Sequence, residues 1–426
     1  MKSFYFGRQR IEEMQTKKLS HLLKFSHDYI PYYRRIFRTL GKGPDDFRGR
    51  AGLQRFPLLT KAEIVSNYPS GLIAGGRERV VIRRGTGTSG VSASVAHSSA
   101  SLDARHALFL RYLTFGGVRP WSSMVTLWIP QPYWRREPDS EGRVRPTTSL
   151  YGYPVWFLGH PLVNIHVVKS IPDDVMKEAR IVSEIAPDIL FGRPTQLRRL
   201  GEAMRKQGIS LAPKAVMASA EFMTPTCVAG LEEVFSSRVF SAMGTSETGG
   251  VASTCPRRTG FHLYEDFMVL EVLRDGEPVG PGEVGEIVVT HLHNYAMPLI
   301  RYRTGDFVRL GDGSGCECGS SLTRFKSVQG REKNWIITAS GEKAWPIEIT
   351  DDIESQLGIK DFQIVQLGLD QFAVRLMDED FGKPELRRWL VEYLGSVVGR
   401  PVNVGFEQRP PDDLWRKYAP VTTRLG

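Results

Sequence analysis

Short apolar runs alternate with longer amphipathic segments through the middle of this 426-residue chain. The apolar runs occupy residues 79–83, 123–129, 187–192, 214–219 and 238–244. The amphipathic segments between them occupy residues 101–117, 173–186 and 195–208. A short apolar run suits a buried strand, whereas hydrophobic residues three and four positions apart suit one face of a helix. The alternation predicts an α/β fold, with a largely parallel sheet and helices on its faces.

Capping residues indicate where these helices begin and end. Ser101, Asp173 and Thr195 stand at expected N-caps, because their side-chain oxygens can accept hydrogen bonds from free backbone N–H groups. Gly116 and Gly208 stand where the chain is expected to leave a helix. Before this region, the opening segment alternates helical patches with chain breakers, which predicts short helices laid over a surface rather than a domain.

The remainder of the chain predicts a strand-rich region and a second lobe. Between residues 266 and 310, apolar runs joined by Asp/Gly turns predict a compact β-region that closes a large domain. Beyond residue 330, strands and one or two helices predict a small α+β lobe. We therefore expect a large N-terminal domain at residues 1–330 and a small C-terminal lobe at residues 331–426, joined near Lys333.

Composition restricts the class of protein. With 41% hydrophobic and 24% charged residues, the chain can bury more than one core, and no apolar run is long enough to span a bilayer. The first residues, MKSFYFGRQRIEEM, carry charges where a secretion signal is apolar, so we expect a cytoplasmic protein. The net charge of +9 favours an anionic ligand, but basic residues are scattered among acidic ones, which argues against nucleic acid or a membrane as partner.

A loop rich in Gly, Ser and Thr follows the first apolar run, and it reads RRGTGTSGVSASVAH from Arg83. Glycine reaches backbone angles that other residues avoid, and with Ser and Thr it lets amide and hydroxyl donors converge on a phosphate. A flexible exposed hairpin fits the same composition equally well. A nucleotide-triphosphatase loop is disfavoured, because Val91 and Ser92 follow Gly90 and the lysine of that motif is missing.

Three later motifs follow this loop in order. Residues 241–250 read SAMGTSETGG, residues 297–310 read MPLIRYRTGDFVRL, and residues 328–346 read VQGREKNWIITASGEKAWP. With FPLLTKAEIVSNYPSGLIA at 56–74 and GFHLYEDFMVLEVL at 260–273, the pattern covers nearly the whole chain. The sequence resembles the acyl-adenylating superfamily of acyl-CoA synthetases, luciferases and peptide-synthetase adenylation domains, and within it phenylacetate-CoA ligase and its relatives. This resemblance implies a large adenylate-forming domain of layered sheets and helices and a small, mobile C-terminal lobe.

The resemblance also implies an enzyme that activates a carboxylic acid. ATP, with Mg²⁺, and the acid give an acyl-adenylate and pyrophosphate, and the acyl group then passes to coenzyme A. The acid is expected to be aromatic or similarly compact, and the expected partners are small molecules, with a homodimer left open. Six aromatic residues support an aromatic acid loosely and fit the core equally well: Trp128, Tyr133, Trp134, Tyr151, Tyr153 and Trp156.

The resemblance assigns the ATP contacts. It places Glu247 on the Mg²⁺ ion and Asp306 on both ribose hydroxyls, although a capping glutamate and a turn aspartate fit the same positions. Val91 stands where the family usually has a lysine, and Met243 where it has an aromatic residue that stacks on adenine. The loop is expected to hold the β- and γ-phosphates, and the later motif the α-phosphate and the base. These residues are Thr86, Gly87, Thr88, Ser89, Gly90, Met243, Gly244, Thr245 and Ser246.

Further site residues are expected at a strand end and at the joint between the lobes. Ser219, Ala220 and Glu221 resemble a Gly-Gly-Glu strand end whose backbone lines the adenine and acyl pockets. Arg331 is expected to reach the ribose or phosphate. Lys333 is expected to be the hinge that absorbs the rotation between the two reaction steps, where relatives more often have paired aspartates.

The catalytic lysine of the superfamily lies near the chain end and donates to the carboxylate oxygen during adenylation. The tail here reads DDLWRKYAPVTTRLG and lacks the usual Gly-Lys pair. Lys417 is the candidate, with Arg416 and Arg424 behind it.

The cysteines predict a local metal site rather than a disulfide scaffold, since there are only four. Cys255, His262, Cys316 and Cys318 supply three thiolates and one imidazole, a usual set for a closed tetrahedral zinc site. The resemblance implies structural zinc here, because some relatives look to carry it at these positions. Reduced buried cysteines with an unrelated histidine are the alternative, and Cys227 is expected to be buried.

Three other functions stay open at this point. The acyl-adenylate could pass to an amine or hydroxyl acceptor in a biosynthetic pathway, which the altered tail and hinge favour. A non-catalytic binding protein of the same fold fits the missing lysine after Gly90, but it gives no reason for Glu247, Asp306 and Arg331 to occur together. A zinc-stabilised nucleic-acid binder fits the charge and leaves the ATP motifs unexplained.

Overall fold

The computed structural model describes most of the chain. The described residues are 2–75, 80–84, 93–128, 149–150, 153–154, 156–157, 160–161, 163–169, 175–409 and 419–425. They form two compact units, each assembled from two stretches of sequence: unit 1 is Met1–Phe115 with Phe240–Ser327, and unit 2 is Gly116–Val239 with Val328–Gly426. The functional division at residues 1–330 and 331–426 groups the chain differently and stays a prediction.

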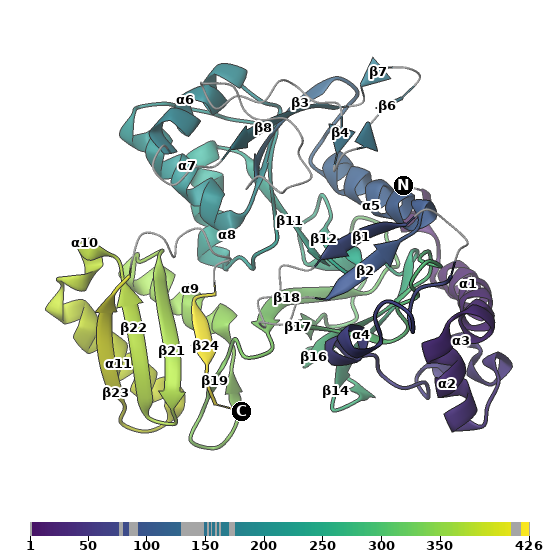
Figure 1. Cartoon of the computed structure of the whole chain (residues 1–426). Coiled ribbons are helices and arrows are strands. Elements are labelled where there is room, and N and C mark those ends of the chain that lie inside the picture. The colour runs from purple at the N-terminus through teal and green to yellow at the C-terminus, as the bar shows by residue number, and fades with distance from the viewer. Residues whose placement is uncertain are drawn as a thin grey trace. The chain divides into compact units, whose positions relative to one another are not determined.

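Unit 2 contains the parallel sheet that the alternating pattern predicted. Its strands and helices are β3 Ser122–Trp128, β8 Val163–Lys169, α6 Val175–Ile185, β9 Ile189–Gly192, α7 Pro194–Lys206, β10 Ala215–Ser219 and α8 Pro225–Phe235. The strand order is β10-β9-β3-β8, and the pairs β3–β8, β3–β9 and β9–β10 are all parallel. Helix α7 makes the crossover between the neighbours β9 and β10, whereas α6 connects β8 to β9, on either side of β3; Figure 1 shows both helices in teal near these strands. The predicted α/β class is confirmed.

Four very short strands also belong to unit 2, in two small hairpins. They are β4 Ser149–Leu150, β5 Tyr153–Pro154, β6 Trp156–Phe157 and β7 His160–Pro161. Strand β4 pairs with β5, and β6 pairs with β7, both antiparallel.

Two of the predicted helix starts are wrong. Helix α5, Ser99–Phe115, already includes Ser101, and α7 begins at Pro194 with Arg193 as its N-cap. Proline suits the first helical position because its missing N–H would be unpaired there, so Pro194 sets the start and Thr195 lies inside the first turn. The predicted ends agree with the structure: Gly116 follows α5, and Gly208 follows α7 with a φ of +65°. Asp173 lies outside the described residues.

The helices at the start of unit 1 build a core, contrary to the prediction of short helices on a surface. They are η1 Lys2–Tyr5, α1 Arg8–Tyr29, α2 Pro31–Leu40, η2 Pro44–Phe47, α3 Gly49–Leu53 and α4 Lys61–Asn67. Helix α1 is 22 residues long, because no breaker interrupts it before Pro31. Its residues Leu19, Leu22 and Leu23 are buried.

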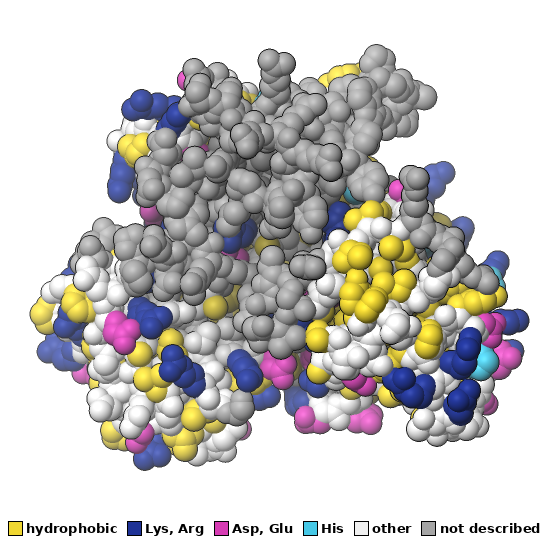
Figure 2. All heavy atoms as spheres, viewed as in Figure 1, with side chains coloured by type: hydrophobic (Ala, Val, Ile, Leu, Met, Phe, Trp, Pro, Cys, Tyr) yellow, Lys and Arg dark blue, Asp and Glu magenta, His cyan; other side chains and the backbone are white. Residues whose placement is uncertain are grey.

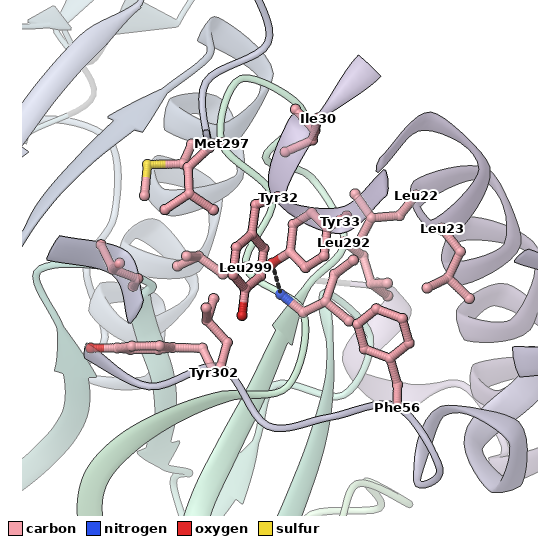
Figure 3. Close-up of a cluster of buried hydrophobic side chains, with 14 of the residues drawn as sticks. Leu22, Leu23, Ile30, Tyr32, Tyr33, Phe56, Leu292, Met297, Leu299 and Tyr302 are labelled. Atoms are coloured by element: carbon pink, nitrogen blue, oxygen red, sulfur yellow. Dashed lines mark hydrogen bonds between the residues drawn. The ribbon is translucent and has the colours of Figure 1, made fainter. Parts of the chain in front are cut away.

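Tyr33 lies at the centre of this core. Its ring is 1% exposed, and its hydroxyl donates to the carbonyl of Pro298 at 2.9 Å and accepts from the amide of Ile300 at 3.1 Å, the second of which is drawn in Figure 3. Leu299 and Tyr302 pack in the same cluster. The first helices are therefore attached to the segment that leads into strand β17, Tyr302–Leu310.

The rest of unit 1 is the strand-rich region that the sequence predicted. Its other strands are β1 Val81–Arg84, β2 Ser94–His97, β11 Arg238–Thr245, β12 Gly249–Thr254, β13 Phe261–Leu263, β14 Met268–Arg274, β15 Glu277–Pro278, β16 Val284–His291 and β18 Arg324–Arg331. Strands β11 and β18 cross the boundary between the units. The order is β15-β14-β16-β17-β18-β13-β12-β11. The pairs β11–β12, β12–β13, β14–β16 and β16–β17 are antiparallel.

Strands β1 and β2 form a separate hairpin. Val95 and Ala96 of β2 are buried, whereas Val81 and Ile82 of β1 are 37% and 45% exposed. Figure 2 shows hydrophobic side chains gathered over this part of unit 1. In the described part of the chain, none of the helices is both long and apolar enough to cross a membrane.

The C-terminal part of unit 2 is the α+β structure that the sequence predicted. Its elements are β19 Ile336–Ile337, β20 Lys343–Ala344, α9 Pro346–Leu357, β21 Phe362–Gly368, β22 Gln371–Leu376, α10 Asp378–Phe381, α11 Pro384–Val398, β23 Asn403–Gln408 and β24 Val421–Thr423. Four strands pair in the order β23-β22-β21-β24, and Figure 1 shows them with α11 behind them. Leu386, Leu390 and Leu394 of α11 are buried in the same cluster as Ile364 and Val374 of the sheet.

A buried ion pair joins distant segments of unit 1. Arg301 donates to both carboxylate oxygens of Glu271, at 3.0 and 2.9 Å, and the two side chains are 5% and 2% exposed. Its remaining terminal nitrogen donates to the carbonyls of Gln54 and Phe56, just before α4. The buried guanidinium of Arg301 therefore has both a counter-ion and backbone acceptors within unit 1.

Replacing Arg301 by Met should lower the free energy of unfolding by about 3–5 kcal/mol, because it leaves the Glu271 carboxylate buried without a cation. Urea unfolding measures the change. The control is Arg274→Met, whose side chain is 53% exposed beside Glu283 and whose loss should cost about 0–1 kcal/mol. Equal losses in the two variants would contradict the role given to Arg301.

Candidate functional site

The turn between β11 and β12 carries the motif SAMGTSETGG, and its backbone needs glycine. A Cβ atom on Gly244 would lie 2.4 Å from the carbonyl oxygen of Gly249, so no other residue fits there. Gly249 itself has a φ of +80° and lies against the Arg105 side chain. The register also shifts between Met243 and Gly244, which marks a β-bulge. The close approach of β11 and β12 at this turn therefore requires glycine at positions 244 and 249.

Hydrogen bonds fix the polar residues of this turn. The Thr245 hydroxyl accepts from the amide of Thr248 at 3.0 Å, and the two threonine hydroxyls lie 3.0 Å apart. Arg105 of α5 donates to the carbonyl of Ser246 at 3.1 Å. The sequence residues Met243 to Glu247 are thus brought together on one ordered turn.

Glu247 lies at the end of this turn and is only 7% exposed. Its Oε1 atom lies 3.9 Å from the Nζ atom of Lys61, at the start of α4. Sequence reasoning did not single out Lys61, although it lies within the motif FPLLTKAEIVSNYPSGLIA. A carboxylate with a single cation at this distance keeps lone pairs available for a metal ion, which prefers oxygen ligands when it is hard.

Two buried histidines lie near the same turn. Burial lowers the pKa of His97 to about 2, and the charge of Arg105 lowers it further. Burial likewise lowers the pKa of His291 to about 3, with smaller contributions from His293 and Arg105. Both rings are therefore neutral at pH 7. Nδ1 of His97 lies 3.0 Å from the Ser101 hydroxyl, which links β2 to α5.

Asp306 lies on β17, in the same unit as Glu247. It is 9% exposed, and its amide donates to the hydroxyl of Thr304 at 3.1 Å. Gly305 before it has a φ of +73°, and its amide donates to Glu286 at 2.9 Å. The aspartate is thus held on a strand by its neighbours rather than on a free turn.

Ser219, Ala220 and Glu221 end strand β10 in unit 2. Ala220 has a φ of +77°, which L-residues rarely adopt, and so it turns the chain as glycine would. The Glu221 carboxylate accepts from the amide and hydroxyl of Thr195 at 3.2 and 2.9 Å and lies 3.6 Å from Arg193. Its side chain is therefore held by the fold, and the expectation that the backbone of this segment lines the adenine and acyl pockets stays a prediction.

The expected hinge also has special backbone angles. Gly330 has a φ of +142°, and a Cβ there would lie 2.5 Å from the Pro346 ring. Lys333 has a φ of +69°, and its carbonyl accepts from the amide of Thr423 on β24 at 3.0 Å. The amide of Asn334 donates to the carbonyl of Arg331 at 2.9 Å. A tight turn therefore follows Arg331, and the hinge role of Lys333 stays a prediction.

Cys255, His262, Cys316 and Cys318 converge in unit 1, with their four ligand atoms within 4.8 Å of one another. The Sγ atoms of Cys255 and Cys316 lie 3.8 Å apart, and Sγ of Cys318 lies 3.5 Å from Nε2 of His262. Zinc–sulfur bonds of about 2.3 Å in a tetrahedron place two sulfurs roughly 3.8 Å apart, so the spacing fits this metal. All three cysteines are free thiols.

Some expected residues lie outside the described part of the chain or have no described side chain. These are the loop residues Thr86, Gly87, Thr88, Ser89 and Gly90, the C-terminal Arg416 and Lys417, and the aromatic residues Trp128, Tyr133, Trp134, Tyr151, Tyr153 and Trp156. Arg424 is described and exposed, and its amide donates to the carbonyl of Gln366. Cys227 is buried as predicted, at 7% exposure, and burial raises the pKa of its thiol to about 12.

Curated relatives named phenylacetate-coenzyme A ligase match this sequence. That of Thermus thermophilus is 27% identical over 351 residues, which cover 80% of this chain and 75% of the relative. That of Escherichia coli is 27% identical over 361 residues, which cover 80% of this chain and 76% of the relative. The chain is thus similar in sequence to phenylacetate-coenzyme A ligases over four fifths of its length. No family model matches it.

Solved structures of acyl-CoA ligases share the fold of this chain. A 2-hydroxyisobutyryl-CoA ligase in the postadenylation state, in complex with 2-HIB-AMP, has a TM-score of 0.78 at 16% identity, covering 100% of this chain and 90% of its own. An anthranilate CoA ligase in complex with anthranoyl-AMP has a TM-score of 0.57 at 13% identity, covering 82% of this chain and 66% of its own. The α/β class is confirmed by this likeness.

The neutral histidines His97 and His291 predict a loss of stability in mild acid. An unfolded histidine titrates near pH 6.5, so below that pH the unfolded state binds protons that the folded state excludes. At pH 5.5, His97 and His291 should each lower the free energy of unfolding by about 1.4 kcal/mol.

Urea unfolding of wild type and His97→Gln between pH 7.5 and 5.5 measures this effect. The variant should lose less stability than wild type over this range, whereas the control His21→Gln, at an exposed histidine of α1, should follow wild type. Parallel curves for wild type and His97→Gln would show that His97 is not buried in its neutral form.

Proposed function

We propose that this chain activates a carboxylic acid with ATP and transfers the acyl group to coenzyme A. A carboxylate oxygen attacks the α-phosphorus of ATP, and the bond to the bridging oxygen breaks, so that pyrophosphate leaves and an acyl-adenylate forms. The coenzyme A thiolate then attacks the acyl carbon, and AMP leaves. The observation that carries this proposal is the similarity over 351 residues to a phenylacetate-CoA ligase. The acid is aromatic or similarly compact.

Unit 1 supplies the nucleotide contacts in this proposal. The Glu247 carboxylate would hold Mg²⁺, which would neutralise phosphate charge when bound. Thr245 and Ser246 face the α-phosphate, and the backbone of Gly244 approaches the nucleotide closely because it has no side chain. Met243 lies against the adenine, and the Asp306 carboxylate accepts hydrogen bonds from both ribose hydroxyls. The order of the β11–β12 turn and the burial of Glu247 and Asp306 support these roles.

The remaining roles belong to unit 2 and to the loop after β1. The backbone of Ser219, Ala220 and Glu221 lines the adenine and acyl pockets, Arg331 reaches the ribose or phosphate, and Lys333 is the hinge. Lys417 donates to the acid carboxylate. The Gly/Ser/Thr loop from Thr86 to Gly90 holds the β- and γ-phosphates. The left-handed backbone at Ala220 and Lys333 supports special roles for those two positions.

The Cys255, His262, Cys316 and Cys318 cluster would hold a structural zinc ion. Such an ion would join β12, β13 and the loop before β18, and it would take no part in the reaction. Burial lowers the pKa of His262 to about 4, so the ring is neutral at pH 7, as a metal ligand must be. A cytoplasmic location and a homodimer stay predictions.

Exchange of labelled pyrophosphate into ATP, with a panel of aryl, heteroaryl and short aliphatic acids, tests the adenylation step. We expect exchange with an aromatic acid and a thioester when coenzyme A is added. Glu247→Ala should lower the exchange rate about 100-fold or more, because the phosphate charge is no longer neutralised. Glu283→Ala, at an exposed glutamate of the same unit, is the control and should match wild type.

Other outcomes of this assay favour the alternatives. Exchange without thioester formation, but with capture by an amine or alcohol, would indicate an amide or ester ligase. Absence of exchange from folded wild-type protein with every acid of the panel would contradict the proposed reaction and favour a non-catalytic binding protein.

Metal analysis of the purified protein should find about one zinc per chain. Removal with a chelator should lower the melting temperature, because the ligand-bearing segments lose their cross-link. Cys316→Ser and Cys318→Ser should each abolish retention of zinc, whereas Cys227→Ser should keep it, since Cys227 lies outside the cluster. Zinc retained by a Cys255→Ser, Cys318→Ser double variant would place the metal elsewhere.

A further inference from the structure

The ion pair between Lys61 and Glu247 differs from an ordinary structural salt bridge. The two side chains are 21% and 8% exposed, and their charged atoms lie 3.9 Å apart, beyond hydrogen-bond distance. Among the described residues, Lys61 is the only cation within 4.0 Å of the Glu247 carboxylate. A buried pair without hydrogen bonds recovers little of the cost of removing both charges from water. The pair therefore contributes little to the free energy of folding, and binding of a ligand explains the arrangement better.

The backbone of Lys61 is held firmly. Lys61 is the first residue of α4, whose N-cap Thr60 accepts from the amide of Glu63 at 3.2 Å. The Glu63 carboxylate in turn accepts from the amide of Thr60 at 2.7 Å and from the Tyr32 hydroxyl at 3.0 Å. The Lys61 side chain takes no part in these hydrogen bonds, which nevertheless fix the position of its backbone.

The residue before this cap is attached to the strand that carries Asp306. The amide of Leu59 donates to the carbonyl of Arg301, and the amide of Arg303 donates to the carbonyl of Leu59, both at 2.9 Å. Leu59 thus lies beside Tyr302 at the start of β17. Lys61 is therefore fixed relative to both Asp306 and Glu247, the two carboxylates proposed to contact the nucleotide.

We propose that Lys61 binds the β- and γ-phosphates of ATP, an inference that rests on the proposed ATP-dependent reaction. Once a metal ion neutralises Glu247, the ammonium group is released from its pair and can bind phosphate oxygens beside that ion. A lysine acts as a point charge on a flexible stem, which suits this change of partner. The Gly/Ser/Thr loop has Val91 after its last glycine and brings no lysine of its own. Lys61 supplies that missing charge from a different segment of the chain.

Calorimetric titration with Mg-ATP and with AMP, both without acid, tests this inference on Lys61→Met and Lys61→Arg. Lys61→Met should weaken Mg-ATP binding about 10- to 100-fold, because one charge-assisted hydrogen bond is lost, and it should leave AMP binding unchanged. Lys61→Arg should keep most of the ATP affinity, because it keeps the charge. Lys42→Met, at an exposed lysine of the same unit, is the control and should match wild type.

The contrast between ATP and AMP separates phosphate binding from a structural role. Equal weakening of both ligands by Lys61→Met, or no weakening of either, would overturn the inference. The melting temperature of each variant shows whether it is folded, and Lys61→Gln, which also removes the charge, replaces Lys61→Met if the latter is unstable. A wild-type chain that binds Mg-ATP but exchanges no pyrophosphate contradicts the proposed reaction alone. A wild-type chain that does not bind Mg-ATP overturns both.

Discussion

One buried guanidinium holds together the parts of unit 1 that carry its site. Arg301 is paired with Glu271 on β14 and hydrogen-bonded to the chain just before α4. Because an arginine stays charged, it can be buried only when all of these partners are present, which makes their assembly cooperative. Leu59 and β17 meet at the same place, and so Lys61 and Asp306 both follow within a few residues of this junction. The relative positions of Lys61 and Asp306 thus depend on a buried contact made by neither of them.

The β11–β12 turn adds a second constraint, which is steric. Gly244 and Gly249 allow the two strands to approach more closely than side chains permit, and the carbonyl of Ser246 is then held by Arg105. The neighbouring histidines are neutral, since burial lowers the pKa of His97 to about 2. The fixed positive charge at the turn therefore comes from arginine and lysine, and it does not change with pH in the physiological range. A polyanionic ligand meets the same field throughout that range.

The sequence predicted those features that depend on neighbouring residues. The parallel sheet was predicted from the spacing of the apolar runs. The Cys/His cluster was predicted from residue type, and the β12–β13 register, which pairs Ser253 with His262, brings Cys255 close to His262. Where two neighbouring residues both suit a helix start, the sequence prediction was wrong. Helix α7 begins at Pro194, and the hydroxyl of Thr195, the predicted N-cap, donates to Glu221 instead. The role proposed for Lys61 could not be predicted from local sequence patterns, because its partner Glu247 lies in a distant segment of the chain.

The surroundings of the buried carboxylates indicate which of them serve the fold. Glu271 accepts two hydrogen bonds from Arg301, Glu354 accepts from Arg198 and Thr224, and Glu221 accepts two from Thr195. Each of these groups has the partners that a buried charge requires. Glu247 accepts no hydrogen bond from the described residues and has only the ammonium of Lys61, 3.9 Å away. A buried carboxylate left in this state is costly, and the metal ion and polyphosphate proposed above would complete its partners and those of the lysine. The Glu221 carboxylate is among the groups whose hydrogen bonds serve the fold.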